Sequence, residues 1–287
     1  MYNFDKTNTM IKEEKRCKNC SQHLLLNQKF CHECGQKTDT HRINFHFLVH
    51  EVQHGIFHVH GGILFTIKEL FTRPGDTLRE YLAGKRKPHF PPLTFVLIMG
   101  SVCALIQFLL KHKKPENKVH NVETSLSKSE ISKYIDFKGL IAYFEHVFEW
   151  LGGHLAFTIL LMLPIAALAF FWGFRKYGYN YPEWLVILLF LAGQCLTLYP
   201  VFIFLNRFVG DFNFFFFMLC WALITFSLVQ FFNTRGKWYV ILRTFWSIFL
   251  SYLLSVVYIV FAILIITAVG VLLYGYDNII PKIMQKL

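Results

Sequence analysis

The chain has 287 residues, of which 54% are hydrophobic, 18% are aromatic and only 16% are charged. Soluble domains carry about 25% charged residues, and the apolar residues here gather in long runs after Pro92, so the composition excludes a soluble globular protein and indicates an integral membrane protein. The formal net charge of +11 favours anionic lipid headgroups over nucleic acid as a partner, because the aromatic residues lie in the apolar runs and not among the basic residues.

The N-terminal segment, MYNFDKTNTMIKEEKR, contains no apolar central region. It therefore predicts no cleavable signal peptide. We expect the N-terminus to stay on the cytoplasmic side of the membrane, with a later span serving as the insertion signal.

Four of the seven cysteines form two C-x2-C pairs separated by ten residues: Cys17, Cys20, Cys31 and Cys34. Two such knuckles can direct four thiolates at one tetrahedral ion, and zinc is the usual metal for four sulfur ligands. We therefore predict a cytoplasmic zinc ribbon over residues 1–40, with the second knuckle on a small β-hairpin and Gly35 in the turn past the last ligand. Disulfides are the alternative and would need an oxidising compartment. A closed four-ligand site is expected to be structural and not catalytic. A unit this small cannot fold on its own core, so we expect the metal to hold it together.

The stretch HFLVHEVQHGIFHVH places a histidine at every fourth position: His46, His50, His54 and His58. At about 100° per helical residue these side chains cover an arc of about 120°, opposite an apolar stripe. The pattern favours the polar side of a helix lying at the membrane interface. Two further interpretations stay open: a metal site built from one adjacent histidine pair with outside ligands, and a surface whose protonation tightens lipid contact.

Residues 41–92 are predicted to form interfacial amphipathic helices. The stretch GILFTIKELF places its apolar residues on one helical face, and Pro74 ends that helix. The stretch DTLREYLAG predicts a second short helix with Asp76 as its N-cap and Gly84 as its stop. A basic cluster follows just before the first span, where it either contacts anionic headgroups or only fixes the topology: Lys85, Arg86 and Lys87.

The stretch ILFTIKELFTRPGDTLREYLAGKRKPHFPPLTF resembles a family of uncharacterised bacterial membrane proteins of the Bacteroidetes type. Members begin with a small zinc ribbon ending in Cys-Gly-Gln, continue with an RPG…EYL.GKR signature, and then have several membrane helices. The signature residues here are Thr66, Leu70, Arg73, Pro74, Gly75, Glu80, Tyr81, Gly84, Lys85, Arg86 and Pro92. The resemblance implies the architecture and a bacterial inner-membrane location, but no activity.

Five apolar segments are long enough, or nearly so, to span a bilayer: about 93–110, 153–173, 184–206, 213–232 and 246–272. Pro164 and Pro200 lie inside the second and third, where we expect kinks. The predicted fold is thus an all-α integral membrane protein with five transmembrane helices over residues 93–287, a small N-terminal zinc ribbon and interfacial amphipathic helices. A cytoplasmic N-terminus places most Lys and Arg residues inside, and it leaves the loop 111–150 and the C-terminus external.

The sequence contains no phosphate-binding glycine loop, no GxSxG and no HExxH. We therefore predict a non-enzymatic, membrane-anchored interaction or accessory module, whose partners are anionic lipids and a protein bound through the ribbon. A small-solute or lipid transporter is the alternative, and it would need a polar path near Pro164, Gln194 and Pro200. A membrane enzyme is the third interpretation. It would use an outer-face cluster: Glu145, His146, Glu149 and His154.

Overall fold

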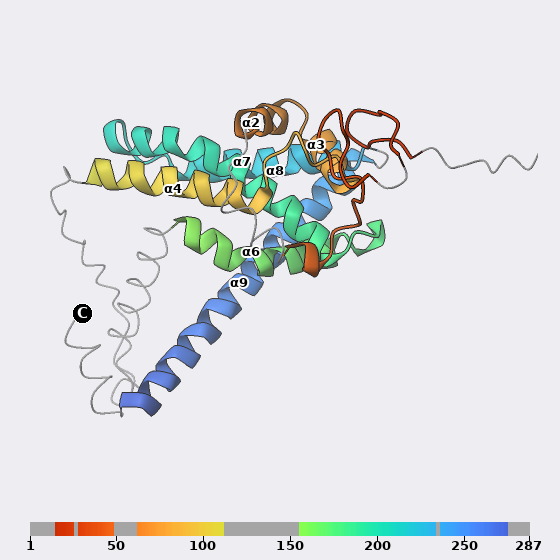
Figure 1. The fold of residues 1–287 in the computed structure, drawn as a ribbon. Helices are drawn as coiled ribbons and strands as arrows, with labels where there is room; N and C mark the ends of the chain where they lie inside the picture. The colour runs from red at the N-terminus through yellow and green to blue at the C-terminus, as the bar shows by residue number, and fades with distance from the viewer. Residues whose placement is uncertain (1–14, 26–27, 49–61, 112–154, 234–235, 275–287) are drawn as a thin grey trace, which may run out of the picture.

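The computed structural model describes residues 15–25, 28–48, 62–111, 155–233 and 236–274 (Figure 1). Regular structure in these ranges is helical, and they contain no β-strand, only two isolated β-bridges near the N-terminus. Five long helices form the body of the protein: α4 (Pro92–Lys111), α6 (Leu155–Gly173), α7 (Tyr181–Phe208), α8 (Asn213–Phe231) and α9 (Lys237–Tyr274). Three short elements accompany them: α2 (Ile63–Thr72), α3 (Pro74–Leu82) and the 3-10 turn η2 (Arg175–Tyr177).

Four of the described helices are long and apolar enough to cross a membrane: α4, α7, α8 and α9 over Lys237–Ala262. The expectation of five spans is therefore wrong by one. The segment expected at 153–173 forms α6, but its described apolar part, Phe157–Gly173, is shorter than the other four. Seventeen helical residues rise only about 26 Å, against about 30 Å of bilayer hydrocarbon. α6 nevertheless packs within the bundle, against α7 and α9.

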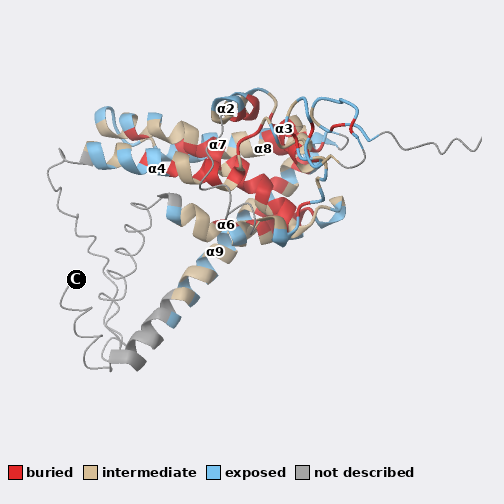
Figure 2. Cartoon of the chain, viewed as in Figure 1, coloured by how far each residue is buried: buried red, intermediate tan, exposed pale blue. Residues whose placement is uncertain are grey.

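Helix α7 lies at the centre of the bundle. Within its apolar stretch 61% of the residues are buried inside the protein, compared with 28% in α4, 22% in α8 and 6% in α9. Figure 2 shows the buried residues gathered along α7 and the parts of α4 and α6 beside it, whereas α9 crosses the bundle and projects away from it. The outer faces of α8 and α9 carry exposed Phe, Leu and Val side chains, as expected for helices that face lipid.

An aromatic cluster joins the end of α6, the start of α7 and the end of α8. The ring centroids of Phe174 and Trp184 are 5.1 Å apart, those of Phe174 and Phe232 are also 5.1 Å apart, and Tyr177 lies 4.3 Å from Phe232. Because rings of this size bury a large apolar area, the cluster fixes these three helix ends relative to one another. We call this end of the bundle, where α4 and α7 begin and α6 and α8 finish, the docked end.

Two spans begin earlier than expected. α7 begins at Tyr181 because Asn180 and Glu183 form a capping box, in which each side chain accepts the backbone N–H of the other residue. α9 begins at Lys237, although its basic residues indicated a loop. The side chain of Arg243 donates to the carbonyl of Gly173 at the end of α6, so this cation stays at the docked end.

The two short helices α2 and α3 match the expected amphipathic pair with one correction. Arg73 separates them, and Pro74 is the first residue of α3. The N–H of a first helical residue has no partner within the helix, so proline loses no hydrogen bond there. Asp76 is therefore inside the helix and is not its N-cap. Its carboxylate forms an ion pair with Arg79 one turn later.

The histidine-rich helix is described only at its start. Residues 45–48 are helical and His46 is exposed. The other three histidines of the pattern, His50, His54 and His58, lie outside the described residues. So does the proposed outer-face cluster: Glu145, His146, Glu149 and His154.

Candidate metal centre and its attachment to the helices

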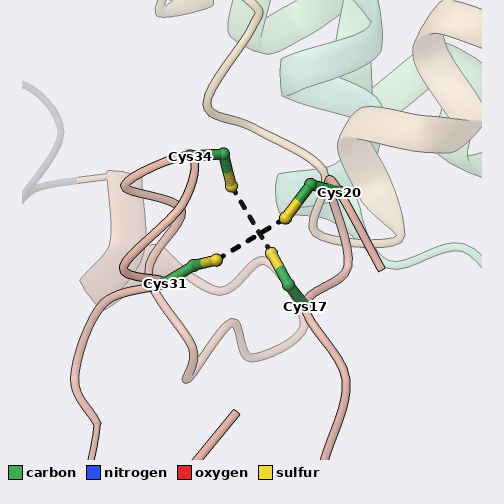
Figure 3. A group of neighbouring side chains, drawn as sticks. All are labelled: Cys17, Cys20, Cys31 and Cys34. Atoms are coloured by element: carbon green, nitrogen blue, oxygen red, sulfur yellow. Dashed lines mark hydrogen bonds between the residues drawn. The ribbon is translucent and has the colours of Figure 1, made fainter. Parts of the chain in front are cut away.

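The four cysteines predicted to bind metal come together in space. All four sulfur atoms lie within 4.8 Å of one another, and the Sγ atoms of Cys17 and Cys34, and those of Cys20 and Cys31, are 3.6 Å apart. Figure 3 shows the side chains converging on one point from two separate loops. A tetrahedral ion with metal–sulfur bonds of about 2.3 Å would space its sulfurs about 3.8 Å apart. The cluster could therefore hold one metal ion.

Both knuckles have the same backbone hydrogen bonds. The N–H of Ser21 donates to the carbonyl of Cys17 at 2.9 Å, and the N–H of Gly35 donates to that of Cys31 at the same distance. Ser21 and Gly35 both have positive φ, 63° and 69°. The turn expected at Gly35 is thus present, and the first knuckle makes the equivalent turn with a serine, a conformation that costs a non-glycine residue of order 1 kcal/mol.

Isolated bridges close the knuckles instead of the expected hairpin. Arg16 pairs with His23 around the first knuckle, and Phe30 pairs with Lys37 around the second. Each bridge is a single antiparallel residue pair and does not extend into a strand. The four-cysteine unit (residues 15–25 and 28–40) therefore has little regular structure of its own, which is typical of a unit that depends on metal.

The cysteines ionise unequally. Burial raises the pKa of the Cys34 thiol, but hydrogen bonds from the side chain of Asn19, the backbone of Gln36 and the neighbouring thiols outweigh it and lower the pKa to about 6. The backbone of Gln22 lowers the pKa of Cys20, but burial and the other three sulfurs raise it to about 12. One thiolate thus forms at neutral pH, whereas further negative charge on the cluster needs a cation to balance it.

The side chain of Gln36 attaches the second knuckle to the turn that precedes α4. Gln36 is only 3% exposed. Its Oε1 accepts the backbone N–H of Arg86 at 3.2 Å and that of Lys87 at 2.8 Å. We call residues 84–87 the GKR turn. The unit also contacts Gly84, which has a φ of 104° and where an added Cβ would lie 2.5 Å from Oγ1 of Thr40.

Two of the three side chains predicted to contact lipid headgroups have contacts with protein groups. Nζ of Lys85 lies 2.8 Å from a carboxylate oxygen of Glu80. The guanidinium of Arg86 lies 4.2 Å from the ring centroid of Phe47 and donates to the carbonyl of His41 at 3.0 Å. Lys87 is exposed. Lipid contact by this cluster stays a prediction.

A second attachment joins residues 42–43 to the start of α7. Arg42 donates to both carboxylate oxygens of Glu183, at 2.6 and 2.7 Å, and the side-chain amide of Asn180 donates to the carbonyl of Ile43 at 3.0 Å. Glu183 is buried, and the bond from Arg42 is bidentate, which is the strong form of this ion pair. Sequence reasoning missed the pair. The Asn-x-x-Glu pattern could have indicated the cap, but nothing in it indicates Arg42.

The signature residues serve to pack α2 and α3 on the bundle. Arg73 pairs with Glu69 and lies 3.1 Å from Glu80. Gly75 lies so close to the backbone of Gln230 in α8 that a Cβ would overlap it, and its N–H donates to Oε1 of Gln230 at 2.6 Å. Arg79, which lies between signature positions, donates to the carbonyls of Gln230 and Phe231 at 2.7 Å each. It therefore caps the end of α8 with a positive charge.

The residues proposed for a transport path line neither the cavity at the junction of α6 and α9 nor the one between α8 and α9. Gln194 is buried, where its amide donates to the carbonyl of Leu70 at 2.8 Å and its oxygen lies 3.4 Å from the hydroxyl of Ser227. The carbonyl of Pro164 accepts the hydroxyl of Tyr181 at 3.0 Å. These groups hold helices together.

Comparison with known proteins gives one match. The model of a family described as a protein of unknown function (DUF3667) matches residues 60–103. That range contains the whole RPG…GKR signature and the first half of α4, and the four cysteines lie before it. No curated protein and no solved structure matches the chain.

Proposed function

We propose that the protein is a non-enzymatic, membrane-anchored interaction or accessory module of a bacterial inner membrane, with a structural zinc site on the cytoplasmic face. The observation that carries this proposal is the attachment of the four-cysteine unit to the GKR turn through Gln36. A rigidly attached unit presents its remaining surface at a fixed place above the membrane. Such an arrangement suits recognition of a partner and supplies no open metal position for catalysis.

Zinc is the metal that best suits the cluster. Four sulfur ligands at tetrahedral spacing favour zinc or an iron–sulfur centre over hard cations, and a single ion fits sulfur atoms that lie within 4.8 Å of one another. The unit buries little beyond Cys17, Leu24 and Cys31, so binding of the ion would supply most of its folding free energy.

The distribution of charge supports a cytoplasmic docked end. Arg175 and Lys176 after α6 and Lys237 at the start of α9 are exposed there. Two tryptophans beside them, Trp172 and Trp238, are also exposed, as in the aromatic belt at a membrane interface. Basic residues and the four-cysteine unit thus share one end, which the positive-inside rule places in the cytoplasm.

Metal content tests the first part of the proposal. The full chain purified in a mild detergent should contain one zinc per chain by elemental mass spectrometry. Cys31→Ser should lose it, whereas Cys220→Ser, which changes a cysteine of α8 outside the cluster, should retain it. Absence of metal from the wild type, or another metal in stoichiometric amount, would contradict a structural zinc site.

Site-specific photo-crosslinking in cells tests the interaction. Phe30 is 59% exposed on the four-cysteine unit, and Phe208 is 73% exposed at the opposite end of α7. A photo-reactive residue at position 30 should give a discrete protein adduct, and one at position 208 should give only lipid adducts. A chain without any protein adduct at position 30, or with the same adducts at both positions, does not act through this unit.

A further inference from the structure

The cytoplasmic junction of α6 and α9 contains a cavity that the proposed function leaves unused. It has a volume of about 400 Å³ and is lined by Lys176, Tyr177, Gly236 and Tyr239. Its volume lies within the range of about 300–1,000 Å³ that is typical of small-molecule sites. The cavity lies at the docked end, between the turn after α6 and the first turn of α9.

The walls of the cavity are fixed by packing. The rings of Tyr177 and Tyr239 lie 6.5 Å apart, and Tyr177 also packs on Phe232 of the aromatic cluster. The guanidinium of Arg243 lies 4.9 Å from the ring centroid of Tyr239 and is itself bound to the carbonyl of Gly173. The two aromatic walls are therefore held from both helices.

The electrostatics of the junction favour an anion. Arg175, Lys176 and Lys237 are all exposed, and none of them forms an ion pair or a hydrogen bond with another described residue. The acids of the neighbouring elements are already neutralised, because Glu183 binds Arg42 and Asp76 binds Arg79. The first turn of α9 begins beside Gly236, and the N-terminal end of a helix carries partial positive charge.

The level of the cavity relative to the membrane surface indicates which kind of molecule supplies the anion. Trp172 is 50% exposed and Trp238 is 78% exposed on either side of the junction, and tryptophans in this position lie at the level of the lipid headgroups. Basic pockets between membrane helices on the cytoplasmic side are suited to the headgroups of anionic lipids. We propose that the cavity binds the phosphate of an anionic phospholipid, with Lys176 as its principal ligand and Lys237 as a second cation beside it.

This site differs from the basic cluster before α4, where Lys85 and Arg86 contact protein groups. The proposal requires the membrane placement of α6 and α9 but does not require zinc or a protein partner. Its failure would therefore leave the metal centre and the crosslinking result unchanged.

The amount of each lipid that stays bound to the protein measures binding at this cavity. The purified full chain is equilibrated with equal amounts of phosphatidylglycerol and phosphatidylcholine in detergent, and the bound lipids are counted by native mass spectrometry. Wild type should retain the anionic lipid preferentially. Lys176→Gln should lower that preference about fivefold, since one near-surface basic residue is worth about 1 kcal/mol, and Lys176→Gln with Lys237→Gln should lower it further. Lys176→Arg should keep it.

Two controls separate the explanations. Lys29→Gln removes an exposed cation of the four-cysteine unit, to which no lipid contact is assigned, and should leave the preference unchanged. An equal loss in Lys29→Gln and Lys176→Gln would show diffuse surface attraction and would overturn the site, as would an unchanged preference in the double variant. Glycerol phosphate, which is the headgroup without its chains, should not displace the bound lipid. Full displacement by it would assign the cavity to a soluble phosphate compound instead. An unchanged thermal unfolding transition in each variant verifies that the chain is folded.

Discussion

Replacing Gln36 by alanine should loosen the contact between the four-cysteine unit and the GKR turn without removing the metal. The substitution deletes one buried oxygen that accepts two backbone N–H groups, those of Arg86 and Lys87, at 3.2 and 2.8 Å. A hydrogen bond of this kind contributes about 1 kcal/mol net, so the loss is about 2 kcal/mol. Such a loss raises the population of the undocked state roughly 30-fold. The cysteines should keep their metal, because the backbone carbonyl of Gln36, which accepts the N–H of Cys31, is unchanged.

Hydrogen–deuterium exchange on the purified full chain measures this effect directly. Peptides covering residues 84–90 should exchange faster by about one order of magnitude or more in Gln36→Ala. Gln28→Ala is the matched control, because Gln28 lies in the same unit, but its side chain accepts only the N–H of Leu25 on an exposed turn. Gln36→Glu keeps an acceptor oxygen and should restore most of the protection. Equal exchange in Gln36→Ala and Gln28→Ala would refute the reasoning that Gln36 fixes the GKR turn.

Three further predictions concern packing, protonation and metal release. Gly75→Ala should destabilise the protein by about 1–3 kcal/mol in thermal unfolding, because the new Cβ overlaps the backbone of Gln230, whereas Gly236→Ala, with open space around it, should cost much less. Burial lowers the pKa of His89 below its ordinary 6.5, and neither ring nitrogen has a hydrogen-bond partner among the described residues. The folded state therefore favours the neutral ring: His89 should reduce stability as the pH falls below about 6.5, and His89→Phe should remove that part of the pH dependence. Bound metal, followed by a chromogenic chelator, should be released as the pH falls, because protons compete with the metal for the four thiolates. Metal release that does not depend on pH would contradict thiolate ligands.

The parts that were predictable from the sequence are those encoded locally. The C-x2-C spacing brings Cys17 and Cys20 together within one turn, so the four-cysteine cluster could be predicted from the spacing alone. Hydropathy located the apolar helices, because a continuous apolar run has few other solutions in a membrane protein. The ends were less certain. Arg243 indicated a loop, but a long side chain can reach back to the helix end, so α9 begins before it.

The attachments between distant segments could not be predicted in this way. Arg42 and Glu183 are 141 residues apart, and Gln36 and Lys87 are 51 residues apart. Neither pair belongs to a periodic pattern, and each residue alone reads as an ordinary surface side chain. The basic cluster shows the same limit: a single sequence does not reveal that Lys85 contacts Glu80 and that Arg86 contacts Phe47.

The bond between Arg79 and the end of α8 bears on the order in which the protein assembles during synthesis. Arg79 lies 151 residues before Gln230, whose carbonyl it caps. At roughly 5–20 residues per second, a ribosome needs on the order of ten to thirty seconds to make the intervening chain. During that interval Asp76, one turn away, is the acid that neutralises Arg79. The α2–α3 pair is thus made long before α8, and only the synthesis of α8 completes this contact.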